Sequence, residues 1–402
     1  MSEPVPLFDL KKTPPRWMSC PESQLLFASL RKAGGEGRFV GGCVRDALLG
    51  EISDDIDVCT NLTPEAVMSG LSSSNIRVIP TGLKHGTVTA VVGDYKYEIT
   101  TLRVDVETDG RHATVSFTEN WREDAARRDF TINALYLTEQ GELNDYFGGQ
   151  QDLQSGIVRF IGDADARIEE DRLRVLRYFR FFARFGEGLP DDKAVKACTK
   201  AASHLGKLSK ERITQEFMRL LETERSPEVL LLMAKTDVLG SILPGEISPD
   251  RYKNLMVLSV GSDVTQRLSV LFQGNKDWAK NISSYLRLSG RTEKRLQAMC
   301  AEDLPLTLSL EEQRASLYQL GVETFTDRLL LAWSKGAKDE ICLQYLDLAK
   351  SWEIPTFPVS GRDLINKGHH PGKVLGELLA KLDAIWIKSD FQMTKSDLLA
   401  RL

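Results

Sequence analysis

The sequence predicts an α+β fold, in which a small mixed α/β unit is followed by an all-helical remainder. Short runs rich in Val, Ile, Thr and Tyr, separated by glycine turns, are typical of strands and stop near residue 140. From about residue 165 onward, apolar residues recur with helical spacing, broken only by Gly and Pro clusters. A chain of 402 residues is too long for one core, so several domains are expected.

The elements of the α/β unit follow one another in short steps. A helix is predicted over residues 24–33 and ends at a glycine-rich turn, and a second short helix covers 46–50. A third helix begins at Thr63-Pro64, because proline is favoured at the first helical position. The predicted strands cover residues 38–40, 56–59, 76–79, 87–92, 95–101 and 133–137.

Composition excludes several classes of protein. Apolar residues make up 42% and charged residues 27% of the chain, which is ordinary for a globular protein, and no run of apolar residues is long enough to predict a membrane partner. The six cysteines are scattered without a CxxC pair, which indicates neither a zinc site nor a disulfide framework and favours a cytoplasmic location. The net charge of −5 argues against a generally basic nucleic-acid binder, although a local basic surface remains compatible with it.

Two aspartates one residue apart form the most informative motif. Asp55 and Asp57 flank an apolar residue at a predicted strand, so both carboxylates are expected on the same side. Such a pair can hold Mg²⁺ and leave its other coordination positions to phosphate and water. An exposed acidic strand without function is the alternative interpretation.

A glycine pair and an arginine precede the two aspartates. Gly42 and Arg45 can receive the phosphates that a divalent cation bridges, although Arg45 could instead form a structural ion pair with Asp46 or Asp55. An apolar run, a glycine pair and then an acidic strand resemble the two-metal site of nucleotidyltransferases of the polymerase-β type. Glu98, which follows a tyrosine on a predicted strand, is the best candidate for a third acidic group, with a structural role equally open.

A second segment, residues 123–134, carries Arg128 and Asp129 where a predicted helix enters a strand. Arginine forks suit triphosphate oxygens, and an aspartate suits a ribose hydroxyl. A capped helix end without further function is the alternative.

A basic helix is predicted over residues 170–184. Asp171 and Arg174 lie three residues apart and are expected on one helical face, which Arg177 and Arg180 extend. Together an aspartate and an arginine offer an acceptor and two donors, which can match the Watson–Crick edge of a base. A solvated basic stripe is the alternative.

In this order, these motifs resemble those of the class II tRNA nucleotidyltransferases, the CCA-adding enzymes, and of the related bacterial poly(A) polymerases. The resemblance rests on GGCVRD with DIDV, on RRDFTINAL and on EDRLRVLRYFRF, and it is strong over residues 38–220 and modest over 355–380. It implies a polymerase-β-like nucleotidyltransferase head followed by an all-α neck, body and tail. The implied divisions are a lead-in (1–24), the catalytic head (25–145), a nucleotide-selecting neck (146–215), and a body (216–330) and tail (331–402) that bind tRNA.

The resemblance also implies a role for each site residue. Asp55 and Asp57 would be catalytic and hold two Mg²⁺ ions. Asp171 and Arg174 would form an amino-acid template that pairs first with cytosine and then with adenine, and Glu170 would orient Arg174. The residues implied to contact the incoming nucleotide or to line the same surface are Gly42, Arg45, Arg128, Asp129, Arg177 and Arg180.

The implied reaction is attack by the 3′-hydroxyl of tRNA on the α-phosphate of CTP or ATP, which adds C, C and A and releases pyrophosphate. The tRNA would bind through its acceptor end and T arm, whereas nothing indicates a protein partner. Residues 103–111 would form a flexible loop that helps the switch from C to A addition. Three alternatives stay open: a poly(A) polymerase, an enzyme that adds only C or only A, and a non-catalytic RNA-binding protein.

Overall fold

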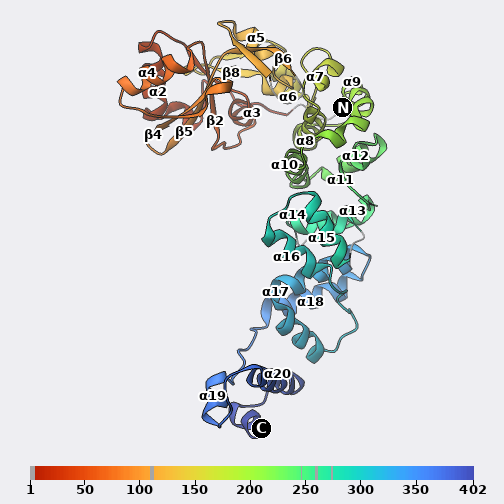
Figure 1. Ribbon diagram of the computed structural model, residues 1–402. Helices are drawn as coiled ribbons and strands as arrows, with labels where there is room; N and C mark the ends of the chain where they lie inside the picture. The colour runs from red at the N-terminus through yellow and green to blue at the C-terminus, as the bar shows by residue number, and fades with distance from the viewer. Residues whose placement is uncertain (1–4, 109–112, 246, 259–260, 273–274) are drawn as a thin grey trace. The chain divides into compact units, whose positions relative to one another are not determined.

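The protein, described by a computed structural model over residues 5–108, 113–245, 247–258, 261–272 and 275–402, forms two compact units. The first comprises residues 1–244 and contains the sheet; the second comprises residues 245–402 and is helical in its described part (Figure 1). The predicted α+β fold class is therefore confirmed.

A mixed seven-stranded sheet organises the start of the first unit. Its strand order is β3-β4-β5-β2-β1-β8-β9, in which β2 and β5 are parallel and every other neighbouring pair is antiparallel. The strands are β1 (Gly37–Val40), β2 (Ile56–Thr60), β3 (Arg77–Gly82), β4 (Thr87–Val92), β5 (Tyr95–Thr101), β8 (Leu135–Leu137) and β9 (Leu143–Asp145). Strand β2 lies between β1 and β5, and its first residues, Ile56 and Asp57, are in register with Tyr97 and Glu98 of β5.

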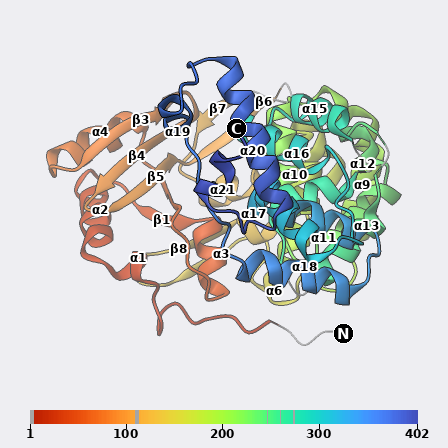
Figure 2. The same cartoon turned by 90° about the horizontal axis from the view of Figure 1, so that it is seen from below.

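Short helices surround this sheet. They are α1 (Arg16–Ser19), α2 (Pro21–Lys32), α3 (Gly42–Leu48), α4 (Pro64–Ser73) and α5 (Trp121–Ala126). Helices α2 and α4 pack against each other and against the sheet (Figures 1 and 2). As the sequence predicts, α4 begins at Pro64, and the Thr63 side chain accepts a hydrogen bond from the backbone N–H of Ala66.

Several sequence predictions in this unit are wrong in detail. Residues 103–108 of the predicted loop form β6 (Arg103–Thr108), which pairs with β7 (Ala113–Phe117); residues 109–111 lie outside the described residues. Helix α3 begins at Gly42 rather than at residue 46. The strand predicted over 133–137 is shorter, because a 3₁₀ turn over Thr131–Asn133 precedes it.

Helices complete the first unit. They are α6 (Gly149–Gln154), α7 (Ala164–Glu170), α8 (Leu173–Phe185), α9 (Asp192–Ala201), α10 (Lys210–Leu221), α11 (Ser226–Lys235) and α12 (Val238–Ile242). The single helix predicted over 170–184 is wrong, because α7 ends at Glu170 and Asp171 is extended (φ −150°, ψ 106°). The Asp171 carboxylate accepts a hydrogen bond from the Leu173 N–H at 3.0 Å and so starts α8 anew.

The second unit consists of α13 (Pro249–Val257), α14 (Val264–Leu271), α15 (Lys276–Tyr285), α16 (Gly290–Met299), α17 (Leu310–Ser334), α18 (Asp339–Ser351), α19 (Gly361–Asn366), α20 (Lys373–Lys388) and α21 (Lys395–Leu399). Near the C-terminus, a separate small core forms around Val359, Leu364, Leu382, Trp386 and Leu398. In the part of the chain that the structure describes, no helix has both the length and the apolar character needed to cross a membrane.

Candidate active site

A cavity of about 670 Å³ in the first unit brings together polar side chains from distant parts of the chain. Its charged lining residues are Arg45, Asp46, Asp55, Asp57, Arg103, Arg127, Arg128, Asp129, Asp171, Arg174, Arg177, Arg180, Arg184 and Arg219. The nine arginines outnumber the five aspartates, so the cavity suits an anionic ligand although the whole chain is acidic. The residues predicted from the sequence to hold metal or nucleotide all line this cavity. Glu170, the predicted orienting residue, contacts one of them, and Glu98, the candidate third acidic group, is not among the lining residues.

The two predicted metal ligands lie at the start of β2. Asp55 immediately precedes the strand and is exposed, whereas Asp57 belongs to the strand and is half-buried. Burial, followed by the negative charge of Asp55, raises the pKa of Asp57 to about 6, and Glu98 adds to this effect against the opposing charge of Arg128. The negative charge of Asp57 is unfavourable so close to other carboxylates. A cation bound between the carboxylates would offset that repulsion.

Glu98 lies next to Asp57 but does not complete a three-residue metal cluster. The two residues are paired in register on the parallel strands β2 and β5, and Glu98 is exposed. No group of three or more His, Cys, Asp or Glu side chains suited to a metal occurs among the described residues. The donor set that the structure offers is therefore Asp55 and Asp57, which leaves coordination positions for phosphate and water.

The glycine pair shapes the cavity through Gly41 rather than through Gly42. Gly41 has φ +74°, a left-handed value that favours glycine. A Cβ atom there would lie 3.4 Å from Nη1 of Arg128 and 3.6 Å from the carbonyl oxygen of Asn133. Gly42 lies within the first turn of α3, where a Cβ would meet only Arg45 at 3.7 Å.

Arg45 forms the structural ion pair that was the alternative to phosphate binding. Its Nε and Nη2 atoms donate to Oδ1 of Asp46 at 2.8 and 2.7 Å, and its Nη1 atom donates to the side chain of Asn133. The guanidinium also lies 4.2 Å from the centre of the Phe185 ring. Arg45 therefore lines the cavity with three of its nitrogen atoms already bonded to protein.

Arg128 is held in place by Asp124, a residue that the sequence prediction did not include. Asp124 is fully buried, and its Oδ2 atom accepts from Nη2 of Arg128 at 3.3 Å and from the Tyr136 hydroxyl at 2.7 Å. Its Oδ1 atom accepts from Nε of Arg127 at 2.8 Å. Although burial acts in the opposite direction, Arg128 and Arg127 lower the pKa of Asp124 to about 2. The spacing of the three residues, four and three apart, is the signal that could have predicted it.

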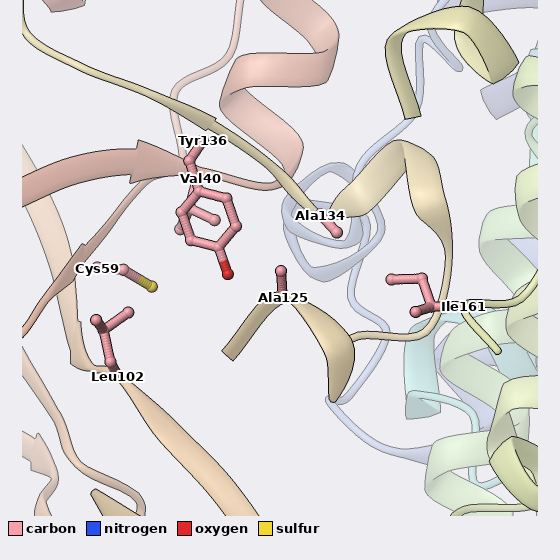
Figure 3. Close-up of a cluster of buried hydrophobic side chains, with 7 residues drawn as sticks. All are labelled: Val40, Cys59, Leu102, Ala125, Ala134, Tyr136 and Ile161. Atoms are coloured by element: carbon pink, nitrogen blue, oxygen red, sulfur yellow. The ribbon is translucent and has the colours of Figure 1, made fainter. Parts of the chain in front are cut away.

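An apolar cluster packs beside this ionic network and shares Tyr136 with it. It consists of Val40, Cys59, Leu102, Ala125, Ala134, Tyr136 and Ile161 (Figure 3). The ring of Tyr136 is completely buried in it, while the hydroxyl is bonded to Asp124. Burial, and then the charge of Asp124, raises the pKa of the Cys59 thiol to about 12, so this sulfur is not a nucleophile at neutral pH.

Asp129 is paired with Arg177 of α8 across the cavity wall. Its Oδ2 atom accepts from Nε of Arg177 at 2.6 Å, and its Oδ1 atom accepts from the side chain of Asn133 at 3.0 Å. Burial opposes ionisation, but Arg177 lowers the pKa of Asp129 to about 2. Arg180 donates to Glu216 of α10 at 2.5 Å. Both α8 arginines therefore carry partners within the protein.

The predicted template residues lie at the break between α7 and α8. The sequence predicted that Asp171 and Arg174 share one helical face. This prediction is wrong, because Asp171 precedes α8. Arg174 donates to Glu170 and, at 2.8 Å, to the carbonyl of Arg167; the predicted contact between Glu170 and Arg174 is present. Asp171 accepts at 2.6 Å from Arg212 of α10, a residue that sequence reasoning missed.

Comparisons with known proteins agree with this fold. The poly A polymerase head domain matches residues 37–159, and the probable RNA and SrmB-binding site of polymerase A matches residues 190–246. The mitochondrial CCA tRNA nucleotidyltransferase 1 of Homo sapiens is 36% identical, over 95% of this chain and 92% of its own length. The CCA-adding enzyme of Lactobacillus delbrueckii is 33% identical, over 88% of this chain and 89% of its own length.

The fold agrees over nearly its whole length with a solved structure. The crystal structure of the Bacillus stearothermophilus CCA-adding enzyme in complex with CTP aligns with a TM-score of 0.76 at 25% identity, and the match covers 96% of this chain and 98% of that enzyme. Both the sequence relatives and this structure are matched over most of their own length, so the likeness is not confined to the head. This chain therefore belongs to the family of the CCA-adding tRNA nucleotidyltransferases and is an enzyme of the nucleotidyltransferase class.

Proposed function

We propose that this enzyme adds C, C and A in turn to the 3′ end of tRNA, using CTP and ATP and releasing pyrophosphate. The observation that carries the proposal is the single cavity in which the two carboxylates of β2, the anchored Arg128 and the pair Asp171 and Arg174 meet. Chemistry and base selection would then take place on one bound nucleotide. Both the human and the Lactobacillus relatives carry this activity in their names.

Divalent metal ions, with Mg²⁺ as the proposed species, would be held by Asp55 and Asp57. The raised pKa of Asp57 supports this fit. Burial and the neighbouring carboxylates destabilise the ionised form of Asp57, and a bound cation would stabilise it. Bound Mg²⁺ supplies charge stabilisation for phosphoryl transfer and lowers the pKa of the attacking hydroxyl. Oxygen-only ligation by two carboxylates is the kind of site that this cation favours.

Binding of the triphosphate would be the role of Arg128. Its Nε and Nη2 atoms are fixed by Tyr136 and Asp124, so Nη1 is the nitrogen that remains to be offered beside Gly41. An arginine held in this way loses little conformational entropy when it binds phosphate. Asp129, fixed by Arg177, would stand near the ribose.

Choice of the base would rest on Asp171 and Arg174. A carboxylate accepts from the exocyclic amino group of cytosine or adenine, and a guanidinium donates to the ring acceptors beside it. Glu170 holds Arg174 and would orient its donors. Uracil and guanine present a carbonyl oxygen where the other two bases present the amino group, so a fixed carboxylate would disfavour them.

The tRNA acceptor would be held by the helical parts of the chain through shape and phosphate contacts. The division into neck, body and tail at residues 215 and 330 is part of this proposal. A solved Thermotoga maritima CCA-adding enzyme is described in complex with tRNA, and it shares the fold of this chain with a TM-score of 0.68.

The cellular location is a separate part of the proposal. We propose a cytoplasmic location for this enzyme, although two vertebrate relatives are named as mitochondrial, and cell fractionation would test it.

Supplying nucleotides one at a time tests the function. The enzyme is incubated with Mg²⁺, tRNA lacking its CCA end, and CTP alone, ATP alone or both, and the products are resolved at single-nucleotide length. We expect two additions with CTP and a third only when ATP is also present. Long A tails would instead indicate a poly(A) polymerase. Addition of only C or only A would indicate a partial enzyme, and the absence of any addition would indicate a non-catalytic RNA-binding protein.

Replacing a metal ligand tests the chemistry separately from RNA binding. Asp55→Ala removes one of the two carboxylates that would hold the cation, so incorporation should fall at least a thousandfold. Because Asp55 is exposed, the fold should remain intact, and tRNA affinity measured by filter binding should stay within a few-fold of the original. Activity that survives this change would remove Asp55 from the metal site.

A further inference from the structure

The carboxylate of Asp171 is held at both of its oxygen atoms by hydrogen bonds within the protein. Its Oδ1 atom accepts from the Leu173 N–H at 3.0 Å, and its Oδ2 atom accepts from Nη2 of Arg212 at 2.6 Å. Two bonds from different elements fix both the position and the plane of a carboxylate. About four lone-pair sites are available on the group, so acceptor capacity remains for a ligand.

Helix α10 presents a row of charged side chains to α8. Arg212, Glu216 and Arg219 are spaced four and three residues apart, which places them on one face of the helix. Glu216 is buried and pairs with Arg180 at 2.5 Å and with Arg177 at 3.7 Å. Arg219 lines the same cavity as those two arginines. One face of α10 therefore carries three charged residues, of which Glu216 contacts α8 and Arg212 contacts Asp171 just before it.

We propose that Arg212 is a positioning residue for base selection, which acts by holding the carboxylate of Asp171 in one orientation; this inference rests on the proposed function. The lone pair that would face the base accepts from an amino group and repels a carbonyl oxygen. A freely rotating carboxylate can turn that lone pair away, and a carbonyl-bearing base then meets less repulsion. Arg212 thus contributes to the rejection of UTP and GTP without touching the nucleotide.

The placement of Arg212 distinguishes this role from general structural support. The side chains of Arg212 and Asp171 are 31% and 28% exposed, so the pair lies at the cavity rim rather than in the core. An ion pair this exposed contributes little to folding stability. In contrast, Glu216 is 6% exposed, and its pairing with Arg180 belongs to the interior of the unit. Loss of Arg212 should accordingly alter selectivity more than stability.

Arg212→Gln tests the proposal in the full-length enzyme on tRNA lacking its CCA end. For each of CTP, ATP, UTP and GTP, kcat/KM for a single incorporation is measured, with the melting temperature recorded in parallel. The ratio of correct to incorrect incorporation should fall about tenfold, the size expected for one charge-assisted hydrogen bond. Arg212→Lys keeps the charge without the planar fork, so it should give an intermediate ratio.

Two further variants make the test specific. Lys196→Gln removes one positive charge from an exposed ion pair with Asp192 on α9, outside the cavity, and should leave selectivity unchanged. In an Asp171→Asn background, Arg212→Gln should cause no additional loss of selectivity, because the group through which it acts is already neutral.

Three results would overturn the proposal while leaving the proposed function intact. One is an Arg212→Gln enzyme that adds CCA with unchanged rejection of UTP and GTP. Another is an equal loss of kcat/KM for all four nucleotides, which would indicate a contact with phosphate or with the RNA acceptor. A third is a full additional loss of selectivity in the Asp171→Asn background. If Arg212→Gln does not fold, the Arg212→Lys ratio alone decides the outcome. Failure of the unaltered enzyme to add CCA would contradict the proposed function instead.

Discussion

At the scale of single residues, Asp124 shows how a buried carboxylate can be fully ionised inside an apolar cluster. Its two oxygen atoms accept from Arg127, Arg128 and Tyr136, and these bonds replace the water that burial removes. The benefit is reciprocal, because each arginine gains a counter-charge and a fixed geometry. Arg128, the arginine proposed to bind phosphate, is in this way oriented by groups on the side away from Nη1.

Asp124→Asn should lower the free energy of unfolding by about 3 kcal/mol at pH 7, because it leaves two arginines without their buried counter-charge. The pKa of Asp124 is about 2 in the folded protein and 3.8 as the reference value. A lowered pKa gives stability that is complete above pH 4 and is lost as pH falls toward 2. The difference from the unaltered protein, measured by urea unfolding, should therefore shrink between pH 4 and pH 2.

A control for this stability measurement is Glu142→Gln. Glu142 forms an exposed ion pair with Lys11, and such a pair contributes less than about 1 kcal/mol. If the two variants lose similar stability at pH 7, the buried network is not the source of the effect.

At the scale of elements, the junction between β1 and α3 brings the backbone close to Arg128. Gly41→Ala forces a side chain onto φ +74° and places a Cβ 3.4 Å from Nη1 of that arginine. We expect a loss of roughly 1 to 2 kcal/mol of stability and at least tenfold weaker CTP binding by calorimetry. Gly42→Ala, where the Cβ has room, should retain stability; strong destabilisation there, or none at Gly41, would contradict this account.

Local chemistry explains which elements the sequence could predict. The strands rich in β-branched residues and the proline start of α4 lie where the pattern predicts them, because their signals come from neighbouring residues. The break at Asp171 was missed, because its three-residue spacing from Arg174 fits a helix, whereas its carboxylate instead accepts from the backbone N–H of Leu173. Strand β6 was not predicted, because the loop over residues 103–111 rests on the family resemblance and not on the local pattern.

The candidate site could be predicted only as far as its sequence motifs reach. The residues of those motifs converge on one cavity, although they are more than a hundred positions apart in the chain. Arg212 and Glu216 were missed, because their partners lie across helix packing that no local pattern encodes. Arg45 shows the converse: its place in a motif favoured phosphate contact, whereas an adjacent Asp46 engages it.

At the scale of the whole molecule, the cavity belongs entirely to the first of the two compact units. A fragment that ends at Pro244 should therefore fold and bind CTP within about tenfold of the affinity of the full chain, as measured by calorimetry. The same fragment should bind tRNA much more weakly, because it lacks the helices of the second unit. Loss of CTP binding in a folded fragment would show that the second unit completes the nucleotide site.

An arginine-rich cavity in a chain of net charge −5 has a kinetic consequence. The negative charges that outweigh those arginines are spread over the rest of the protein, where they repel RNA phosphates. Collisions at the wrong place are then brief, and those near the cavity are prolonged by attraction. The repulsion and the attraction both act over about a Debye length. Added salt should therefore slow productive encounters at the cavity, and it should make encounters elsewhere on the surface less brief by comparison. The same balance favours departure of a finished polyanionic product.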